Sequence, residues 1–133
     1  MIFAFEVATS RAQELVDISR KVRNAVREAG VSDGVCFVSV PHTTAGVAVN
    51  ENTDPDVRED ILNALDRAVP RAAPYYKHAE GNAHAHIKAT LVGSSQAIPI
   101  QGGHLALGTW QTIFLCEFDG PRTRKVVVSV MPG

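Results

Sequence analysis

The chain has 133 residues, of which 45% are hydrophobic and 20% are charged, and its net charge at neutral pH is −1. This length predicts a single domain over residues 1–133 that can fold around its own core without disulfides or a structural metal. The balanced charge, with no basic block, argues against nucleic acid as a partner. No apolar run approaches the ~20 residues of a membrane-spanning helix, which excludes a membrane partner.

The first third of the chain predicts two strands and a helix. Residues 2–7 have the character of a strand. Residues 14–18 fit either a strand or the start of a helix, and we favour a strand because Ser19 would make a good N-cap for the following helix. Apolar residues then recur at helical spacing up to Gly30, which supplies the C-terminal stop.

The middle of the chain predicts a broken β region followed by two helices. A strongly β-prone run over 35–40 is interrupted by a histidine-containing turn and resumes over 47–49. Thr53-Asp54-Pro55 predicts a helix start, because a capping side chain precedes a proline at the first helical position. An apolar stripe continues that helix to Pro70. Residues 70–82 predict a loop, and residues 85–92 a short helix.

The last third predicts strands over 96–101, 110–118 and 125–131, separated by glycine-containing turns. Strands interspersed with three helices, without a regular βα alternation, predict an α+β fold with a mostly antiparallel or mixed sheet. Cys36 and Cys116 each lie in an apolar strand-like run. They predict reduced core residues of a cytoplasmic protein, and the apolar N-terminus lacks the basic region of a signal peptide.

The five histidines carry the main indication of chemistry. His42 opens the turn after the 35–40 strand, and Thr43 and Thr44 beside it offer hydroxyls and turn amides that could meet an anion. His42 could equally be hydrogen-bonded into the turn. Imidazole is the commonest protein metal ligand and titrates nearest neutrality, so a metal site or an acid/base site is the first hypothesis. Three further histidines, His78, His84 and His86, share one short stretch with Glu80, Asn82 and Lys88.

Spacing limits which of these histidines can share a metal ion. In a helix, His84 and His86 would be separated by about 200° of rotation, so both are not expected to bind one ion. His86 and His78 form the more plausible pair, because the loop between them can fold back. Lys88 could meet a phosphate or carboxylate, or extend to solvent.

Other candidates carry weaker signals. Glu51 falls far from His42 if the strands on either side of the histidine turn form a hairpin; otherwise a distant carboxylate or another subunit must complete the site. Ser94 and Ser95 follow Gly93 in a weak anion-loop pattern. Trp110 is either core packing or the wall of a pocket.

Four blocks of the sequence combine glycines with polar and aromatic residues at fixed spacings. One of them is Ser95-x-x-Ile98-x-Ile100-x-x-Gly103, followed after four residues by Gly108-Thr109-Trp110-Gln111-x-Ile113. The others are Pro41-His42-Thr43-Thr44-Ala45-Gly46, Asn50-Glu51-Asn52-x-Asp54-Pro55-Asp56-Val57, and Glu80-Gly81-Asn82 with Ala85-His86-Ile87-Lys88. In order and spacing, the four blocks resemble the YjbQ-like family of small uncharacterised proteins.

The resemblance implies an α+β fold, a homotrimer with a site where subunits meet, and a bound divalent metal, zinc being the first choice. It also implies a low, secondary thiamine-phosphate synthase activity, which joins a pyrimidine pyrophosphate to a thiazole phosphate. Carried over by position, it makes His42, His78 and His86 the metal ligands. The catalytic candidates are Glu51, Glu80, His84 and Lys88, and the substrate-binding candidates are Thr43, Thr44, Asn50, Asn82, Ser94, Ser95 and Trp110.

One position departs from the family pattern, which has Asp where this chain has His84. If that carboxylate is a general base or orients a ligand, its replacement weakens the inherited reaction. His84 could instead accept a proton near neutral pH or add a metal ligand.

Two functional hypotheses follow. The first is a metal-dependent enzyme that acts on a phosphorylated small molecule, in which Lys88 and the 94–95 turn bind anionic oxygen and Glu51 or Glu80 moves a proton. The second is a non-catalytic homotrimeric protein that binds a metal or a small molecule. An open metal site favours the first, and a closed four-ligand site that includes His84 favours the second.

Overall fold

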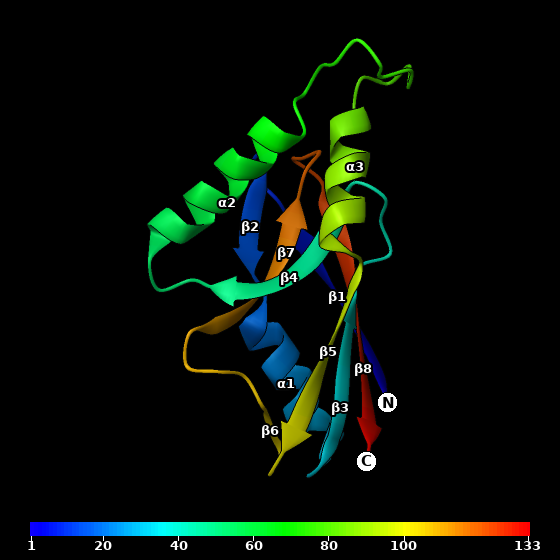
Figure 1. The fold of residues 1–133 in the computed structure, drawn as a ribbon. Helices are drawn as coiled ribbons and strands as arrows, with labels where there is room; N and C mark the ends of the chain where they lie inside the picture. Colours follow the sequence, from blue (N-terminus) through cyan, green and yellow to red (C-terminus); the bar gives the residue numbers. More distant parts are fainter.

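Two antiparallel sheets and three helices make up the fold in a computed structural model that describes residues 1–133 (Figure 1). The strands are β1 (Ile2–Ala8), β2 (Glu14–Asp17), β3 (Gly34–Ser39), β4 (Ala45–Glu51), β5 (Ser95–Gln101), β6 (His104–Leu105), β7 (Gln111–Glu117) and β8 (Thr123–Pro132). The helices are α1 (Ser19–Ala29), α2 (Pro55–Ala68) and α3 (Ala83–Val92).

The strands divide between a five-stranded sheet, in the order β1-β8-β3-β5-β6, and a three-stranded sheet, in the order β2-β7-β4. Every strand pair is antiparallel, which confirms the predicted α+β fold. β3 and β4, on either side of the histidine turn, belong to different sheets and therefore do not form a hairpin.

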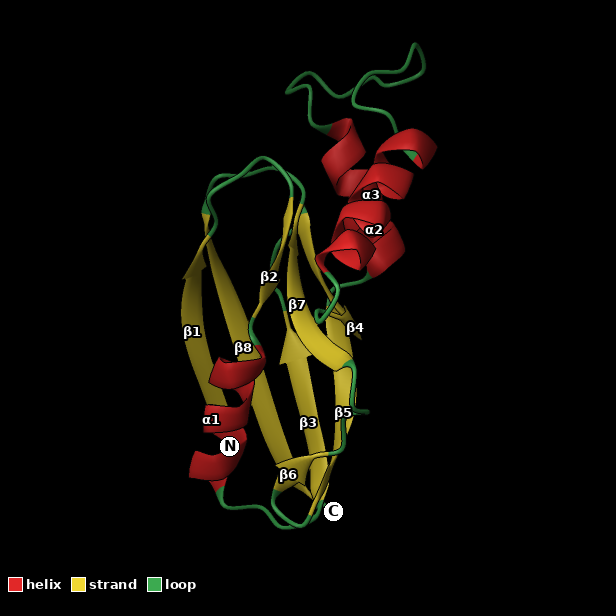
Figure 2. Ribbon diagram, turned by 90° about the vertical axis from the view of Figure 1, so that its left-hand side faces the viewer, coloured by secondary structure: helices red, strands yellow, loops and turns green.

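The main core lies between the two sheets and α1. In β8, Val126, Val128 and Val130 alternate with more exposed residues and are all buried, as expected for a strand with one face on the core. Val22 and Val26 of α1 pack into the same cluster. Figure 2 shows α1 alongside β1 and β8, away from the other two helices.

A second, smaller core lies on the opposite face of the three-stranded sheet. β7 serves both cores, because Ile113 and Leu115 face the main core while Phe114 and Cys116 belong to the second. α3 and α2 cover this second face, but none of the α2 residues is fully buried. The three-stranded sheet is therefore the middle layer of the fold, and α2 is its most loosely packed cover.

The C-terminus of α3 packs directly against the start of β4. The Val47 N–H donates to Gly93 O at 3.0 Å, and the Val40 N–H donates to Ser94 O at 2.8 Å. A Cβ atom at Gly46 would lie 2.6 Å from Gly93 O and 3.1 Å from Val92 Cγ1. The absence of a side chain at Gly46 thus allows the close approach that brings α3 beside the histidine turn.

Several element boundaries differ from the sequence predictions. Ser19 is the first helical residue of α1, not its N-cap; the cap position is Ile18. The Ser19 hydroxyl instead accepts a hydrogen bond from the Ile113 N–H at 2.9 Å, a tertiary contact that the local pattern does not reveal. α3 begins at Ala83, earlier than predicted, and Trp110 lies in the turn before β7 rather than in the strand.

Cys36 and Cys116 are buried free thiols, as expected of core residues. Burial raises the pKa of Cys36 to about 11 and that of Cys116 to about 12, so both are protonated at neutral pH. None of the three helices combines the length and hydrophobicity that crossing a bilayer requires.

We predict that Gly46→Ala lowers the free energy of unfolding by about 1–3 kcal/mol, because the new methyl group forces α3 away from β4. Urea unfolding measures this change. Gly108→Ala is the matched control, since a Cβ there makes only an ordinary 3.4 Å contact with Gln111. Equal stability of the two variants would contradict close packing of α3 on β4.

Candidate functional site

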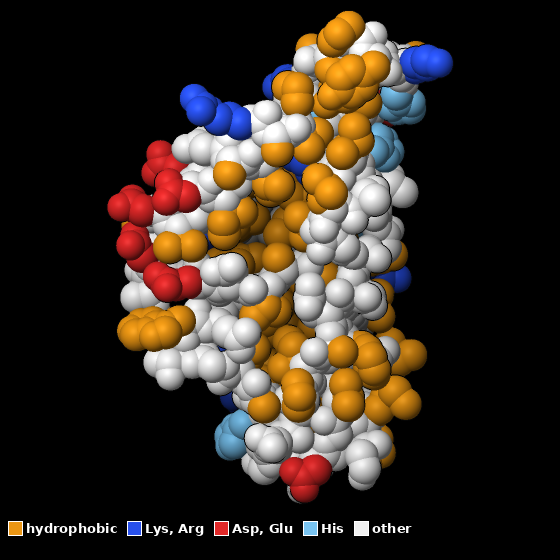
Figure 3. Space-filling model, viewed as in Figure 1, with side chains coloured by type: hydrophobic (Ala, Val, Ile, Leu, Met, Phe, Trp, Pro, Cys, Tyr) orange, Lys and Arg blue, Asp and Glu red, His pale blue; other side chains and the backbone are white.

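Three histidines from separate parts of the chain line one pocket. His42 comes from the turn between β3 and β4, His78 from the loop before α3, and His86 from α3 itself. The ring centroids of His78 and His86 are 5.2 Å apart, with the rings nearly perpendicular. The cavity measures about 460 Å³ and contains no hydrophobic residue in its wall. Figure 3 shows histidine side chains gathered at the outer edge of α3.

His42 is fixed in the pocket by the backbone of β8. Its Nε2 accepts a hydrogen bond from the Lys125 N–H at 2.8 Å. Burial, followed by the charge of Arg124, lowers the pKa of His42, so the ring is neutral at neutral pH. A neutral ring that accepts through Nε2 carries its proton on Nδ1. In this arrangement His42 can donate a hydrogen bond into the pocket.

His84 and His86 lie on different sides of α3, as their spacing predicts. His86 lines the pocket, whereas His84 is buried and its Nδ1 has no hydrogen-bond partner. Burial lowers the pKa of His84, and the charges of Lys88 and Arg71 lower it further. His84 is a neutral interior side chain and does not line the pocket.

Lys88 is also directed into the protein rather than into the pocket. Its side chain is fully buried, and its ammonium group is paired with Asp66 of α2 and donates to Gln13 Oε1 at 2.7 Å. The expectation that Lys88 meets a phosphate in the histidine site therefore disagrees with the structure. Lys88 lies one helical turn after His84, on the side of α3 that faces the core.

A buried ion pair forms the floor of the pocket. Arg124 of β8 donates through Nε to Glu117 Oε1 at 2.9 Å and also pairs with Oε2 through a second nitrogen. The same guanidinium donates to the hydroxyl of Thr44 at 2.9 Å and to its carbonyl oxygen at 3.2 Å. Thr9 donates from its hydroxyl to Glu117 Oε1 at 2.8 Å. Arg124 lines the pocket, so its guanidinium, neutralised by Glu117 on its buried side, is held in a fixed position near His42.

The pair holds Glu117 in its ionised form. Burial raises the pKa of the carboxyl group, but the hydrogen bonds from Arg124, the Asp119 N–H and Thr9 outweigh burial and bring the pKa below its ordinary value. A buried carboxylate with this many donors is stable only as part of the complete network.

A second charged group lies at the rim. Arg122 donates to the Asp119 carboxylate at 2.9 Å, and the Asn82 side-chain amide donates to the same oxygen at 2.9 Å. All three residues line the pocket, and the Asn82 Oδ1 is buried without a partner. Half of the Arg122 side chain remains exposed, so its guanidinium can also contact a ligand.

The structure brings together only part of the predicted set. Thr43, Thr44, Glu80 and Asn82 line the histidine pocket, and Ser94 lines an adjoining pocket that shares His42, Thr43 and His86 with it. Ser95 pairs with Ser39 at the start of β5 and lines neither pocket.

Asn50, Glu51 and Trp110 are not part of this site within one chain. Asn50 and Glu51 end β4, whereas the histidine turn precedes its start, about 20 Å away along the strand. Trp110 is 60% exposed and precedes Gln111, which pairs with Glu51. The three residues mark the far end of the three-stranded sheet.

Sequence reasoning missed Glu117, Asp119, Arg122 and Arg124. Two of them had a detectable signal, because Glu117 is in phase with Ile113 and Leu115, and Arg124 is in phase with the three buried valines of β8. Opposite charges at core-facing positions of two strands indicate a buried pair.

The residues of the histidine pocket meet some, but not all, of the requirements of a divalent metal site. The imidazoles of His78 and His86 are neighbours in an open pocket, and imidazole is a ligand that zinc accepts. The Nε2 of His42 is taken by the Lys125 N–H, so this ring becomes a ligand only by giving up that bond. No three His, Cys, Asp or Glu side chains are already grouped as a metal site.

Comparison with known proteins assigns the family. The model of the UPF0047 protein YjbQ-like family matches residues 3–133. The chain belongs to the YjbQ-like family. A UPF0047 protein of Methanocaldococcus jannaschii is 47% identical over 131 residues, which cover 98% of this chain and 94% of that protein. The UPF0047 protein YugU of Bacillus subtilis is 43% identical, with 98% and 99% covered.

Solved structures of this family have the same fold. A crystal structure of an uncharacterised YjbQ/UPF0047 protein from Clostridium acetobutylicum gives a TM-score of 0.95 at 54% identity and covers 97% of this chain and 99% of that one. A YbjQ-like protein of unknown function from Sulfolobus solfataricus gives a TM-score of 0.95 at 37% identity, with 100% and 97% covered. The resemblance predicted from the sequence blocks is thereby confirmed.

We predict that Glu117→Gln lowers the free energy of unfolding at neutral pH by about 3 kcal/mol, because it leaves Arg124 buried without its counter-charge. The folded-state pKa of Glu117 lies below its ordinary value. The pair therefore stabilises fully above the ordinary Glu pKa of about 4, and its contribution is lost as pH falls through the folded-state value.

Urea unfolding of wild type and Glu117→Gln at neutral and acidic pH measures this change. The difference between them should shrink on acidification, whereas Glu28→Gln on the exposed surface of α1 should match wild type at both pH values. A difference that is the same at both pH values would contradict the ionised pair.

Proposed function

We propose that the protein is a metal-dependent enzyme that acts on a phosphorylated small molecule in the His42, His78 and His86 pocket. One observation carries this proposal: the three imidazoles share a polar, open pocket with Arg122 and Arg124. Imidazoles suit a divalent transition metal such as zinc, and guanidinium groups suit phosphate oxygens. Membership of the YjbQ-like family adds the expectation of a low, secondary thiamine-phosphate synthase activity, whose two substrates both carry phosphate.

The charges of the pocket support a joint requirement for metal and phosphate. Arg122 and Arg124 contribute two positive charges, whereas Glu80, Asp119 and the Glu117 carboxylate paired with Arg124 contribute three negative ones. A phosphate dianion that enters this net negative pocket therefore needs further positive charge. A divalent cation bound by imidazoles supplies it without introducing another carboxylate.

Each side chain of the histidine pocket has a separate role in this proposal. His78 and His86 would hold the metal, which when bound would supply Lewis-acid chemistry toward a phosphate oxygen or a water molecule. Arg122 binds a phosphate oxygen at the rim, while Arg124, fixed by Glu117, contributes a positive charge from the floor. Glu80 and Asp119 lie at the same pocket and are the groups in reach to accept a proton. His42 donates from Nδ1 to the ligand, and it would be a third metal ligand only without its hydrogen bond from the Lys125 N–H.

We also propose that the protein is a homotrimer, as the family resemblance implies. The support is an uncovered apolar face on the five-stranded sheet, opposite α1. Ile2 and Phe37 both lie across from Ser129 in the strand register, and they share this outer face with Met131 two positions along β8. Figure 3 shows hydrophobic side chains gathered over the part of the molecule that contains β3 and β5. Such a face is typical of a subunit contact.

A cytoplasmic location is part of the same proposal. It is supported by two buried cysteines that remain free, as in a reducing compartment.

A non-catalytic homotrimeric metal- or small-molecule-binding protein is the alternative. The hydrogen bond between His42 and Lys125 favours its small-molecule-binding form, because it occupies one of the three imidazoles, whereas His84 lies outside the pocket and does not close a four-ligand metal site. Turnover separates the two proposals, because a binding protein retains metal and phosphate without converting any phosphorylated substrate.

We predict about one zinc or other transition-metal ion per chain in protein purified without added metal, measured by elemental mass spectrometry. His86→Ala should lose most of it, since one of the neighbouring imidazoles is removed. His104→Ala is the control, because His104 is exposed in β6 and outside the pocket.

The zinc-loaded protein should also slowly join the pyrimidine pyrophosphate and the thiazole phosphate, and His86→Ala should not. Stoichiometric metal in His86→Ala would refute the assigned ligand, and metal without turnover in wild type would favour the binding protein.

A further inference from the structure

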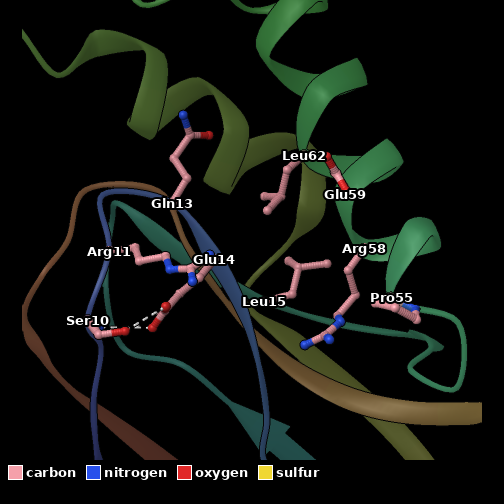
Figure 4. A pocket seen from close by; sticks show the side chains of 9 residues that line it. All are labelled: Ser10, Arg11, Gln13, Glu14, Leu15, Pro55, Arg58, Glu59 and Leu62. Atoms are coloured by element: carbon pink, nitrogen blue, oxygen red, sulfur yellow. Dashed lines mark hydrogen bonds between the residues drawn. The ribbon is translucent and has the colours of Figure 1, made fainter.

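A second cavity lies between the start of β2 and the underside of α2 (Figure 4). It measures about 600 Å³ and shares no residue with the histidine pocket. Its wall consists of Ser10, Arg11, Gln13, Glu14, Leu15, Pro55, Arg58, Glu59 and Leu62.

Two guanidinium groups in this wall have no partner. Arg11 comes from the loop between β1 and β2, and Arg58 comes from α2. Neither takes part in an ion pair, and neither side chain donates a hydrogen bond. The Nε of Arg58 is buried and still lacks an acceptor. A buried donor of this kind is normally paired, so an acceptor from outside the chain would complete the site.

The two carboxylates of the wall do not fill this role. Glu14 accepts from the Ser10 N–H and from the Ser10 hydroxyl, each at 3.0 Å, and forms no ion pair with either arginine. Glu59 is exposed, and Figure 4 shows its carboxylate and the Arg58 guanidinium extending in different directions. The guanidinium of Arg58 instead points down from α2 toward β2.

The remaining wall is apolar where the helix meets the strand. Leu15 of β2 and Leu62 of α2 lie on either side of the cavity, with Pro55 at its end. Since no residue of α2 is fully buried, this side of the helix keeps apolar surface that a ligand could cover.

We propose that this cavity binds a small monocarboxylate with an apolar body. The carboxylate lies at the Arg58 guanidinium, whose planar donors match its geometry, and the apolar body lies against Leu15 and Leu62, while Arg11 adds a positive charge elsewhere in the wall. A single negative charge fits better than a phosphate dianion, because Glu14 and Glu59 surround the same cavity and repel a second charge.

The cavity is connected to the helix that carries His86. Gln13 of the cavity wall donates from its side chain to Asp66 of α2 at 2.8 Å, and Asp66 pairs with Lys88 of α3. A ligand held between β2 and α2 would therefore lie next to the contacts that fix α3.

Sodium hexanoate is the probe, titrated into the full-length ¹⁵N-labelled protein and followed by amide correlation spectra. We expect saturable shifts at Leu15 and Leu62, with a dissociation constant of about 1 mM or lower. Arg58→Gln should weaken binding about tenfold, the scale of one charge-assisted hydrogen bond. Arg67→Gln, an exposed position of the same helix outside the cavity, should bind like wild type.

Related probes test which ligand charge the cavity prefers, and a second variant tests the role of its arginines. Hexyl phosphate should bind more weakly than hexanoate, and hexylamine should not bind. Arg11→Gln, in an exposed loop, should also weaken binding and serves if Arg58→Gln does not fold. The proposal is overturned by the absence of saturable shifts, by shifts confined to the His42 and His86 pocket, or by equal binding to Arg58→Gln and wild type.

Discussion

The buried pair between Glu117 and Arg124 is the constraint on which the candidate site depends. Each charge comes from a different sheet, and each occupies a core-facing position that a valine or leucine could otherwise fill. Either charge alone would be strongly destabilising in that position, so the two are tolerated only together and with their hydrogen bonds complete. Thr9 and Thr44 complete them, which ties the end of β1 and the histidine turn to the same point.

The histidine pocket forms around this fixed point. Arg124 holds the carbonyl and hydroxyl of Thr44, and the neighbouring residue of β8 donates its N–H to His42. Close contact at Gly46 then sets the position of α3, and with it His86. His42 and His86 are thus oriented by buried contacts, whereas His78 comes from the exposed loop before α3.

The elements were largely predictable because each has a local signal. Asp54 caps α2 through the Asp56 N–H, Gly30 ends α1 in the left-handed conformation, and the spacing of His84 and His86 correctly separated them on α3. The pairing of His78 with His86 was also predicted, because only a short loop separates them.

The positions that the sequence did not reveal depend on tertiary contacts. Nothing near Lys88 in the sequence indicates Asp66 and Gln13, the partners that hold it in the interior. Likewise, Glu51 resembles a site residue in its motif, yet it lies at the opposite end of β4 from His42. In a trimer, such a far end could face another subunit, as the family resemblance implies for the site. Arg122 and Asp119 were read only as a turn, although they complete the rim.

The most direct test of the central claim is calorimetric titration of inorganic phosphate into zinc-loaded and zinc-free protein. The excess of carboxylates over guanidinium groups at the histidine pocket predicts saturable binding to the zinc-loaded form, clearly weaker binding to the zinc-free form, and a loss of affinity in Arg122→Gln. Equal binding with and without zinc, or no binding to either form, would contradict a joint metal and phosphate site in this pocket.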